Sequence, residues 1–587
     1  LDTRIDVFQL YSDNPEDPVV APGYVSWNRD RGIRLIERAR LALGPGARLH
    51  LTAALDHTRQ RSFAQAPKIR GAMPFTDRLT EGRATGRYIG GTYLAPVHLE
   101  GDPWLVYTRL EGELQGDLLD FGHEVRAGVE WRREWNDGSG YQFDIEFPPQ
   151  VRFNGVQGFD RPRPFSDIPA LATAALYLDD RMSRPVLGEG LLNVQAGARL
   201  DLLHERGHWF SGIRDALLQP RLNVELAPRQ WLRLRGGIGT TAKLPNLGQL
   251  HPGPQYYDVV NVNRFSNDPA ERLAVLTTFI RDPTNPDLGY ARANKAEAGF
   301  ELDLGPSASV GVVAFRDGVH GAVGISPEPR FLLRDIYELT DSVEGNGVPP
   351  RIIEPPVRAD TVPILVDRPA NNLRLLSEGL ELTASFPEIP RLRTRVQVQG
   401  AWIRSEFHKD DIDFSHPFSD FQLDGRDPRT PYWEAITRLG ERALLTYRLV
   451  HHQPELGLVV TATVQQTLKL DRHDVGGTDT LSWAGYLTRD GRLIPVPREE
   501  RGQAQYRDLR VGRSGLSEPR PAPSDWFLNL QVSKTLPLDG RLSFYAFNAL
   551  DRRGRFPTST NNGLVFPPMR FGLELSAPAA VLERLVP

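Results

Sequence analysis

Apolar and polar residues alternate with a period of two in many stretches of the chain, each roughly ten residues long. In the segment LLNVQAGARLDL, Leu192 and Leu200 fall on one face of an extended strand, whereas Asn193 falls on the other. Successive side chains of a strand point to opposite faces, so this pattern predicts strands with one apolar and one polar face. The same alternation recurs in residues 125–131, 222–226, 380–386, 528–533 and 570–576.

The connections between these stretches alternate between tight and long. The tight ones carry turn residues, as in GPG at 44–46, GD at 116–117 and PLDG at 537–540. Long connections are unusual in a compact soluble domain, but transmembrane β-barrels have short turns at one rim and long external loops at the other. The long connections are expected at 60–103, 133–169, 242–293, 325–373, 407–436, 471–525 and 551–568.

Together the two patterns predict an all-β fold, namely a transmembrane antiparallel β-barrel with about 18 strands in this chain. The even number agrees with bacterial single-chain barrels. The predicted strands lie near residues 1–11, 33–43, 47–58, 104–115, 118–132, 170–182, 189–205, 217–226, 230–241, 294–304, 308–324, 374–386, 391–406, 437–450, 456–470, 526–536, 541–550 and 569–577.

Composition excludes several other classes of protein. The 587 residues include no cysteine, which rules out disulfides, thiolate metal sites and a thiol nucleophile. With 70 basic and 74 acidic side chains, the net charge of −4 argues against a nucleic-acid binder, which needs a basic face. The mean hydropathy is −0.38, and no apolar stretch approaches the roughly 18 residues of a membrane-spanning helix. The strands of a membrane barrel do not produce a long apolar stretch, because apolar and polar residues alternate along them.

Motifs for catalysis and cofactor binding are absent from the sequence. The chain has no GxSxG elbow, GxxxxGK[ST] loop or HExxH helix. Asp410, Asp411 and Asp413 could supply oxygen ligands to calcium, but an acidic polar loop is the commoner explanation. We therefore expect that the protein is not an enzyme and has no cofactor and no metal site.

Five segments, in order along the chain, resemble TonB-dependent outer-membrane receptors. The first is QPRLNVELAPRQWLRLRGGIGTTAKLPNLGQL at 219–250, and the last is PMRFGLELSAP at 568–578. The similarity covers about residues 120–577. It implies a location in the outer membrane of a diderm, Gram-negative bacterium, and uptake of a scarce ligand such as a siderophore, cobalamin, glycan or peptide. The other three segments are 285–305, 371–386 and 526–556.

The resemblance also implies a domain organisation. Residues 1–577 would form the barrel, and residues 578–587 a C-terminal tail. Family barrels have about 22 strands, so we expect that some first strands precede Leu1. The N-terminal plug domain of the family has no counterpart here, and we expect it outside this chain. The implied partners are outer-membrane lipid, the TonB system acting through that plug, the small-molecule or oligomeric ligand, and a surface or periplasmic protein, but no nucleic acid.

Two long connections carry the candidate ligand-binding residues, because polar and aromatic groups converge in them. The two tyrosines of HPGPQYYDVVNVNRF could stack on a sugar or a catechol, whereas the competing explanation is that each loop packs its own rings for rigidity. SHPFSDFQLDGRDPRTPYW is the second segment. The candidates are Tyr256, Tyr257, Asp258, Asn261, Asn263, Arg264, Phe418, Phe421, Arg426, Arg429 and Tyr432.

Two other functions stay open on the sequence. One is a structural or docking barrel in a larger cell-surface assembly, and the other is an open diffusion porin. A plugged receptor would remain closed to small ions, whereas a porin would conduct.

Overall fold

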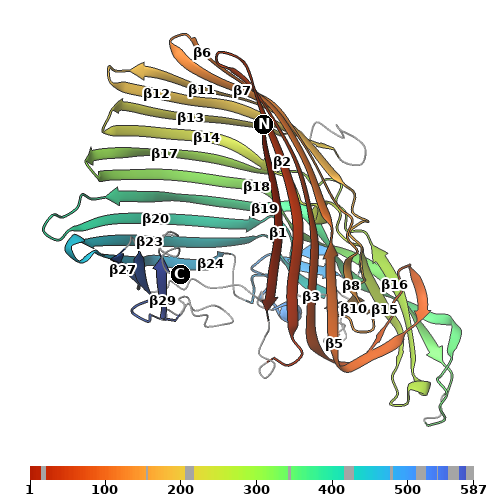
Figure 1. The fold of residues 1–587 in the computed structure, drawn as a ribbon. Coiled ribbons are helices and arrows are strands. Elements are labelled where there is room, and N and C mark those ends of the chain that lie inside the picture. Colours follow the sequence, from red (N-terminus) through yellow and green to blue (C-terminus); the bar gives the residue numbers. More distant parts are fainter. Residues whose placement is uncertain are drawn as a thin grey trace, which may run out of the picture.

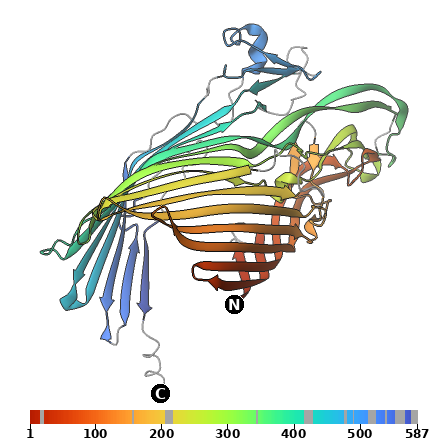
Figure 2. The same ribbon diagram turned by 90° about the horizontal axis from the view of Figure 1, so that it is seen from above.

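The computed structural model describes residues 1–14, 21–153, 157–204, 217–341, 345–414, 429–475, 480–488, 490–510, 524–537, 540–552 and 568–576. Its main feature is a curved, 20-stranded antiparallel sheet (Figures 1 and 2). Without β5 (Arg87–Gly101) and β8 (Gly140–Phe143), 18 strands remain, and each pairs with the next one along the chain. The predicted all-β antiparallel architecture is confirmed. In pairing order the 18 strands are β1 (Asp2–Asn14), β2 (Val25–Gly44), β3 (Ala47–Phe75), β6 (Pro103–Leu118), β7 (Phe121–Asn136), β11 (Leu171–Val186), β12 (Gly190–His204), β13 (Leu217–Arg229), β14 (Leu232–Lys243), β17 (Ala291–Gly305), β18 (Ala308–Leu339), β19 (Ile352–Ser385), β20 (Thr394–Lys409), β23 (Ile436–Gln453), β24 (Leu458–Val475), β27 (Asp525–Thr535), β28 (Arg541–Phe547) and β29 (Arg570–Ser576).

The sheet has two edge strands, β1 and β29. Within the described residues, β1 pairs with β2 and β29 pairs with β28, and the two edges do not pair with each other. The two additional strands lie beside the end of β3 that is far from its tight turn, where β5 pairs with β3 and β8 pairs with β5. The predicted tail at 578–587 lies outside the described residues.

Tight turns join the strands at one rim of the sheet. Leu119 and Asp120 connect β6 to β7 with φ values of 50° and 61°. A two-residue turn with positive φ at both positions matches the twist of the flanking strands. The prediction of this turn at 116–117 was wrong, because the ladder continues to the pair formed by Leu118 and Phe121 before the chain reverses.

The sheet has an apolar and a polar face, as the alternation predicts. Leu51, Leu110, Val129 and Leu176 are in register across β3, β6, β7 and β11, and they are 42%, 43%, 47% and 51% exposed. Glu111 points to the opposite face and is only 7% exposed. We call the exposed apolar face the outer face and the packed polar face the inner face. An apolar outer surface around a polar interior is the arrangement of a membrane β-barrel.

At the rim opposite the tight turns, external segments fold over the inner face. Leu171 of β11 and Leu203 of β12 pack there against Leu250 of helix α1 (Leu247–Leu250) and against Leu288. Asn246 caps α1 by accepting a hydrogen bond from the backbone N–H of Gln249. Among the described residues, no helix has the length and hydropathy to cross a membrane.

Three small sheets and three short helices belong to this external region, whereas a fourth short helix, η3 (Pro454–Leu456), lies in the tight turn between β23 and β24. A three-stranded sheet contains β4 (Gly82–Thr85), β15 (Gln255–Arg264) and β16 (Leu273–Arg281). A four-stranded sheet contains β21 (Asp413–Phe414), β22 (Arg429–Trp433), β25 (Gly485–Thr488) and β26 (Leu493–Pro495). The remaining external elements are β9 (Val151–Phe153), which pairs with β10 (Gln157–Phe159), and the 3-10 helices η2 (Pro269–Glu271) and η4 (Ala504–Leu509).

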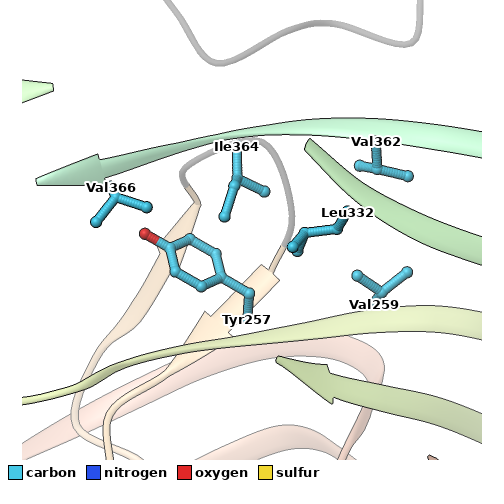
Figure 3. Packing of buried hydrophobic residues seen from close by; sticks show 6 residues of the cluster. All are labelled: Tyr257, Val259, Leu332, Val362, Ile364 and Val366. Atoms are coloured by element: carbon cyan, nitrogen blue, oxygen red, sulfur yellow. The ribbon is translucent and has the colours of Figure 1, made fainter. Parts of the chain in front are cut away.

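The expected long connection at 325–373 is wrong, because β18 and β19 fill most of it. The two strands form a long hairpin that runs past the neighbouring strands (Figure 2). The prolines of both strands interrupt the apolar–polar alternation that would have predicted them. Ile364, on one face of β19, is fully buried against the three-stranded sheet. Figure 3 shows this packing. The cluster consists of Tyr257, Val259, Leu332, Val362, Ile364 and Val366.

The other face of the same hairpin is covered by the four-stranded sheet. Leu365 lies between two members of the first cluster in sequence but packs with Leu487 of β25 and Phe414 of β21. The external part of β19 therefore has two buried faces, which explains why it does not alternate cleanly. Parts of the expected connection at 60–103 are also strands, since β3 extends to Phe75 and β5 pairs with it.

Candidate ligand-binding site

External segments enclose a cavity of about 1050 Å³ above the inner face. The walls come from the connection between β7 and β11, from the connection between β14 and β17, and from the β18–β19 hairpin. The polar and aromatic side chains that line it include Tyr141, Arg161, Arg163, Gln249, Tyr256 and Asp367.

A buried ion pair lies in the wall of this cavity. Nη2 of Arg161 donates to both carboxylate oxygens of Asp258, at 3.2 and 3.0 Å, and the two side chains are 1% and 0% exposed. The hydroxyl of Thr278 also donates to Asp258, at 2.8 Å. Burial raises the pKa of Asp258, and the neighbouring Arg161 guanidinium opposes that rise. The pair fastens the loop after β10 to the β15–β16 hairpin.

Two arginines position the cavity wall through aromatic and backbone contacts. The guanidinium of Arg161 lies 5.0 Å from the ring centre of Tyr256, which makes a cation–π contact. Both terminal nitrogens of Arg163 donate to the carbonyl oxygen of His251, at 3.2 Å each. The backbone of Arg163 also exchanges hydrogen bonds with Tyr141, at 2.9 Å each. The lining is therefore held in place from several directions.

The structure divides the first predicted group between the cavity, the core and the surface. Tyr256 is half-buried and lines the cavity. Tyr257 is only 3% exposed, and its hydroxyl donates to the carbonyl oxygen of Leu365 at 2.7 Å. Its ring packs in the hydrophobic cluster shown in Figure 3, and Tyr257 also contributes to the cavity lining. Asp258 lies in the ion pair.

The last three members of that group lie farther along β15. The amide of Asn261 donates to the carbonyl oxygen of Asp335 at 3.1 Å. Asn263 accepts a hydrogen bond from the hydroxyl of Tyr88 at 2.8 Å, and Arg264 is exposed. These contacts join β15 to its neighbours and do not reach the cavity lining.

The second predicted group is only partly described. Phe418, Phe421 and Arg426 lie outside the described residues. Arg429 is held by Asp508, with Nε to Oδ2 at 2.8 Å and Nη2 to Oδ1 at 2.6 Å.

The two described members of this second group, Arg429 and Tyr432, pack among aromatic side chains. The guanidinium of Arg429 lies 5.0 and 5.5 Å from the ring centres of Tyr486 and Tyr506. Tyr432 is 4% exposed and meets Phe414 edge to face, and its burial raises the pKa of its hydroxyl. The described part of this group therefore packs within its own sheet.

A carboxylate fastens the tip of the β18–β19 hairpin to the β15–β16 hairpin. Glu271 of η2 accepts backbone N–H bonds from Gly345 at 2.6 Å and Gly347 at 3.1 Å, and a hydroxyl bond from Ser266 at 3.1 Å. The Gly347 N–H holds the pKa of Glu271 below its ordinary value, and the other donors add to this effect. The external segments are thereby tied to one another at their outer ends.

Charged side chains of neighbouring strands pair along the inner face below. Arg199 contacts both Glu130 and Asp201 at 2.7 Å, and Arg221 contacts Asp179 at 2.7 Å. A second hollow of about 510 Å³ lies beside Arg199. The polar half of the sequence alternation therefore forms an ion-paired lining rather than an apolar core.

Sequence reasoning missed Arg161 and Arg163, which lie in an expected long connection. Their signal was the run RPRP at 161–164, in which prolines restrict the backbone on either side of each arginine. In the described part of the chain, no group of three acidic or histidine side chains could hold a metal ion. Asp410 instead contacts Arg374, and Asp411 accepts from Asn372 at 3.0 Å.

A family model described as "TonB dependent receptor-like, beta-barrel" matches residues 3–329. No curated protein matches the chain. The outer membrane transporter YddB from Escherichia coli is similar in structure, with 13% identity and a TM-score of 0.50, over 98% of this chain and 66% of that one. At this identity the likeness shows the fold alone.

Two receptor structures are similar at lower scores. The siderophore receptor PirA from Acinetobacter baumannii has 11% identity and a TM-score of 0.45, over 98% of this chain and 80% of its own. A mutant of the ferric enterobactin receptor PfeA from Pseudomonas aeruginosa has 15% identity and a TM-score of 0.45, over 94% and 69%. The family model, by contrast, covers more than half of this chain. The chain therefore belongs to the TonB-dependent receptor β-barrel family, whose members are receptors and transporters, not enzymes, in the outer membrane of Gram-negative bacteria.

Proposed function

We propose that this chain is the barrel of a receptor that imports one scarce solute through the outer membrane with energy from the TonB system. The observation that supports the proposal is the external cavity of about 1050 Å³. Its volume is at the upper end of the roughly 300–1,000 Å³ range of small-molecule sites. The candidate ligand classes are a siderophore, cobalamin, a glycan and a peptide.

The construction of the cavity supports a binding role. Its walls join three external segments that are far apart in sequence, and a fully buried ion pair links two of them. Preorganised walls reduce the ordering cost of binding. The half-buried ring of Tyr256 offers a face for a planar or sugar-like group, and Arg163 adds a positive charge to the same lining.

We also propose that residues 1–577 act as one barrel unit. TonB would act through a plug domain outside these residues. The inner-face ion pairs leave the barrel lining polar, which suits contact with a hydrated domain.

The test is uptake by cells that carry the complete protein. The probes are a radiolabelled ferric tris-catecholate, cyanocobalamin, an oligosaccharide series and an oligopeptide series. One class should accumulate, and only in cells with TonB. Tyr256→Ala should weaken binding of that class by about tenfold, the effect of losing one well-stacked ring. Tyr24→Ala, which removes an exposed ring from another external position, should leave binding unchanged.

Three results would contradict the proposal. The first is that no probe class accumulates, and the second is accumulation without TonB. The third is a steady small-ion conductance of the purified protein in a planar bilayer, which would favour an open porin. Equal loss of binding in the Tyr256→Ala and Tyr24→Ala variants would show that the ligand does not bind in the cavity.

A further inference from the structure

The apolar outer face ends in a row of stacked rings on β3, β6 and β7. The ring centres of His57 and Trp104 are 3.9 Å apart, and those of Trp104 and Trp135 are 6.0 Å apart and nearly parallel. His57 is on the same face as Leu51, six residues farther from the tight turn at 45–46. A tilted strand crosses the hydrocarbon in roughly 9–11 residues, which places this row at the external membrane interface.

Four arginines lie on the same outer face, directly beyond the aromatic row. Arg31 of β2 is opposite Arg59 of β3, and Arg29 is opposite Arg61 in the same ladder. Like charges directly opposite each other in a sheet repel and destabilise it. Arg31 and Arg59 are both exposed, and we call the four residues the arginine cluster.

The chain itself neutralises only part of this charge. Arg61 contacts Glu100, and Arg29 lies 4.6 Å from the ring centre of Trp27. Within the described residues, neither Arg31 nor Arg59 forms an ion pair with a carboxylate. The opposed pair at the centre of the cluster therefore carries two uncompensated positive charges.

Three strands on the other side of the sheet carry a different arrangement on the outer face. On β18, β19 and β20, Arg316 is opposite Glu378, which in turn is opposite Arg404. Charges of opposite sign alternate there across the strands. The opposed arginines of β2 and β3 therefore differ from this row, which provides a matched control.

We propose that the arginine cluster binds the phosphorylated headgroup of a lipid in the outer leaflet. Its guanidinium groups can each donate two parallel hydrogen bonds to phosphate oxygens. The cluster faces lipid rather than the barrel interior, and the adjacent rings of Trp104 and Trp135 mark the depth at which headgroups begin. A phosphate at this depth removes the repulsion between Arg31 and Arg59, while the acyl chains lie along the apolar face below.

The test measures lipid binding by the complete protein in an uncharged detergent. The probes are diphosphorylated lipid A in mixed micelles of that detergent, its dephosphorylated analogue in the same micelles, and inorganic phosphate. Each basic residue near an anionic surface contributes a factor of about five, so Arg31→Gln with Arg59→Gln should weaken binding of the diphosphorylated lipid about 25-fold. Arg316→Gln with Arg404→Gln, the matched control, should change it less than threefold.

Four outcomes would overturn the proposal. They are unchanged binding by the Arg31 and Arg59 variant, an equal loss in the control, equal binding of the dephosphorylated lipid, and displacement of the lipid by an equal concentration of inorganic phosphate. The last result would point to a free-phosphate site.

Thermal unfolding without lipid separates binding from folding. Because the substitution of Arg31 and Arg59 removes a repulsive pair, the variant should unfold at the same temperature as the unchanged protein or higher. A lower unfolding temperature would show that the two arginines stabilise the strands themselves, and would also overturn the proposal.

Discussion

The ion pair between Arg161 and Asp258 should hold the external cavity together, and Asp258→Asn tests this directly. The substitution keeps the size of the side chain and an oxygen that can accept from Thr278. It removes the negative charge that lies 3.0 Å from Nη2 of Arg161. The buried arginine then loses the counter-charge of Asp258.

The size of the effect follows from the burial of the pair. At 3.0 Å and an effective dielectric constant of about 20, the two charges attract each other by about 5 kcal/mol. Desolvation of both groups offsets much of this attraction, but removing one partner of a buried pair costs about 3–5 kcal/mol. Even the lower value should increase the open population of the β15–β16 hairpin by about 100-fold or more.

Amide hydrogen exchange measures that opening. In the Asp258→Asn variant, β15 and β16 should exchange about 100-fold faster, whereas β11 to β14 should exchange at their original rates because their ladder is separate. Arg161→Met combined with Asp258→Leu should recover most of the protection, since an apolar pair of similar size often replaces a buried ion pair without loss.

Two results would refute the reasoning. If Asp258→Asn leaves the exchange of β15 unchanged, the pair does not hold the hairpin. If the double variant exchanges as fast as the single one, the loss arises from packing or from the bond between Arg161 and the carbonyl oxygen of Arg78, and not from the uncompensated charge.

Two further predictions concern the outer face and the hairpin tip. Leu110→Lys places a charge in the lipid-facing row and should lower the free energy of unfolding by about 2–4 kcal/mol, measured by urea titration in lipid vesicles. The control, Thr173→Lys on the inner face of β11, should lower it much less. Equal losses in the two variants would contradict the assignment of the two faces. The pKa of Glu271 is lowered in the folded protein, so its contribution is complete above the ordinary value of about 4.5 and is lost as the pH falls below it. Proteolysis of the 345–347 tip should accelerate in that acid range, and Glu271→Gln should show the fast rate already at pH 7; a variant that resists cleavage as well as the unchanged protein would argue against the tie.

The strands of the main sheet could be predicted because their cause is local. In lipid every backbone group must be paired within the protein, and one face of each strand must be apolar, so a period of two is required along each crossing segment. Leu192 and Leu200 of β12 show this pattern, and the sequence alone located all 18 strands of the main ladder to within a few residues at their turn ends.

The candidate site could be predicted only in part. Part of the segment HPGPQYYDVV lines the cavity, Tyr256 included, whereas its role in ligand binding stays a prediction. Tyr257, the next residue, packs in the core because Ile364 and Leu332 of the β18–β19 hairpin cover it. No local sequence pattern relates that hairpin to β15. Two adjacent tyrosines of a strand necessarily face opposite ways, but the packed face was chosen by a distant element.

Some features of the fold therefore follow from the local sequence, and others follow only from tertiary contacts. The sequence by itself determined the all-β class, the strand order and the two faces of the sheet, because membrane solvation imposes a short-range period on each strand. Only the tertiary structure decided that β18 and β19 continue beyond the membrane, and that Arg161 meets Asp258 from 97 residues away. Above the membrane, burial comes from contacts between distant segments, and such contacts leave no period in the chain.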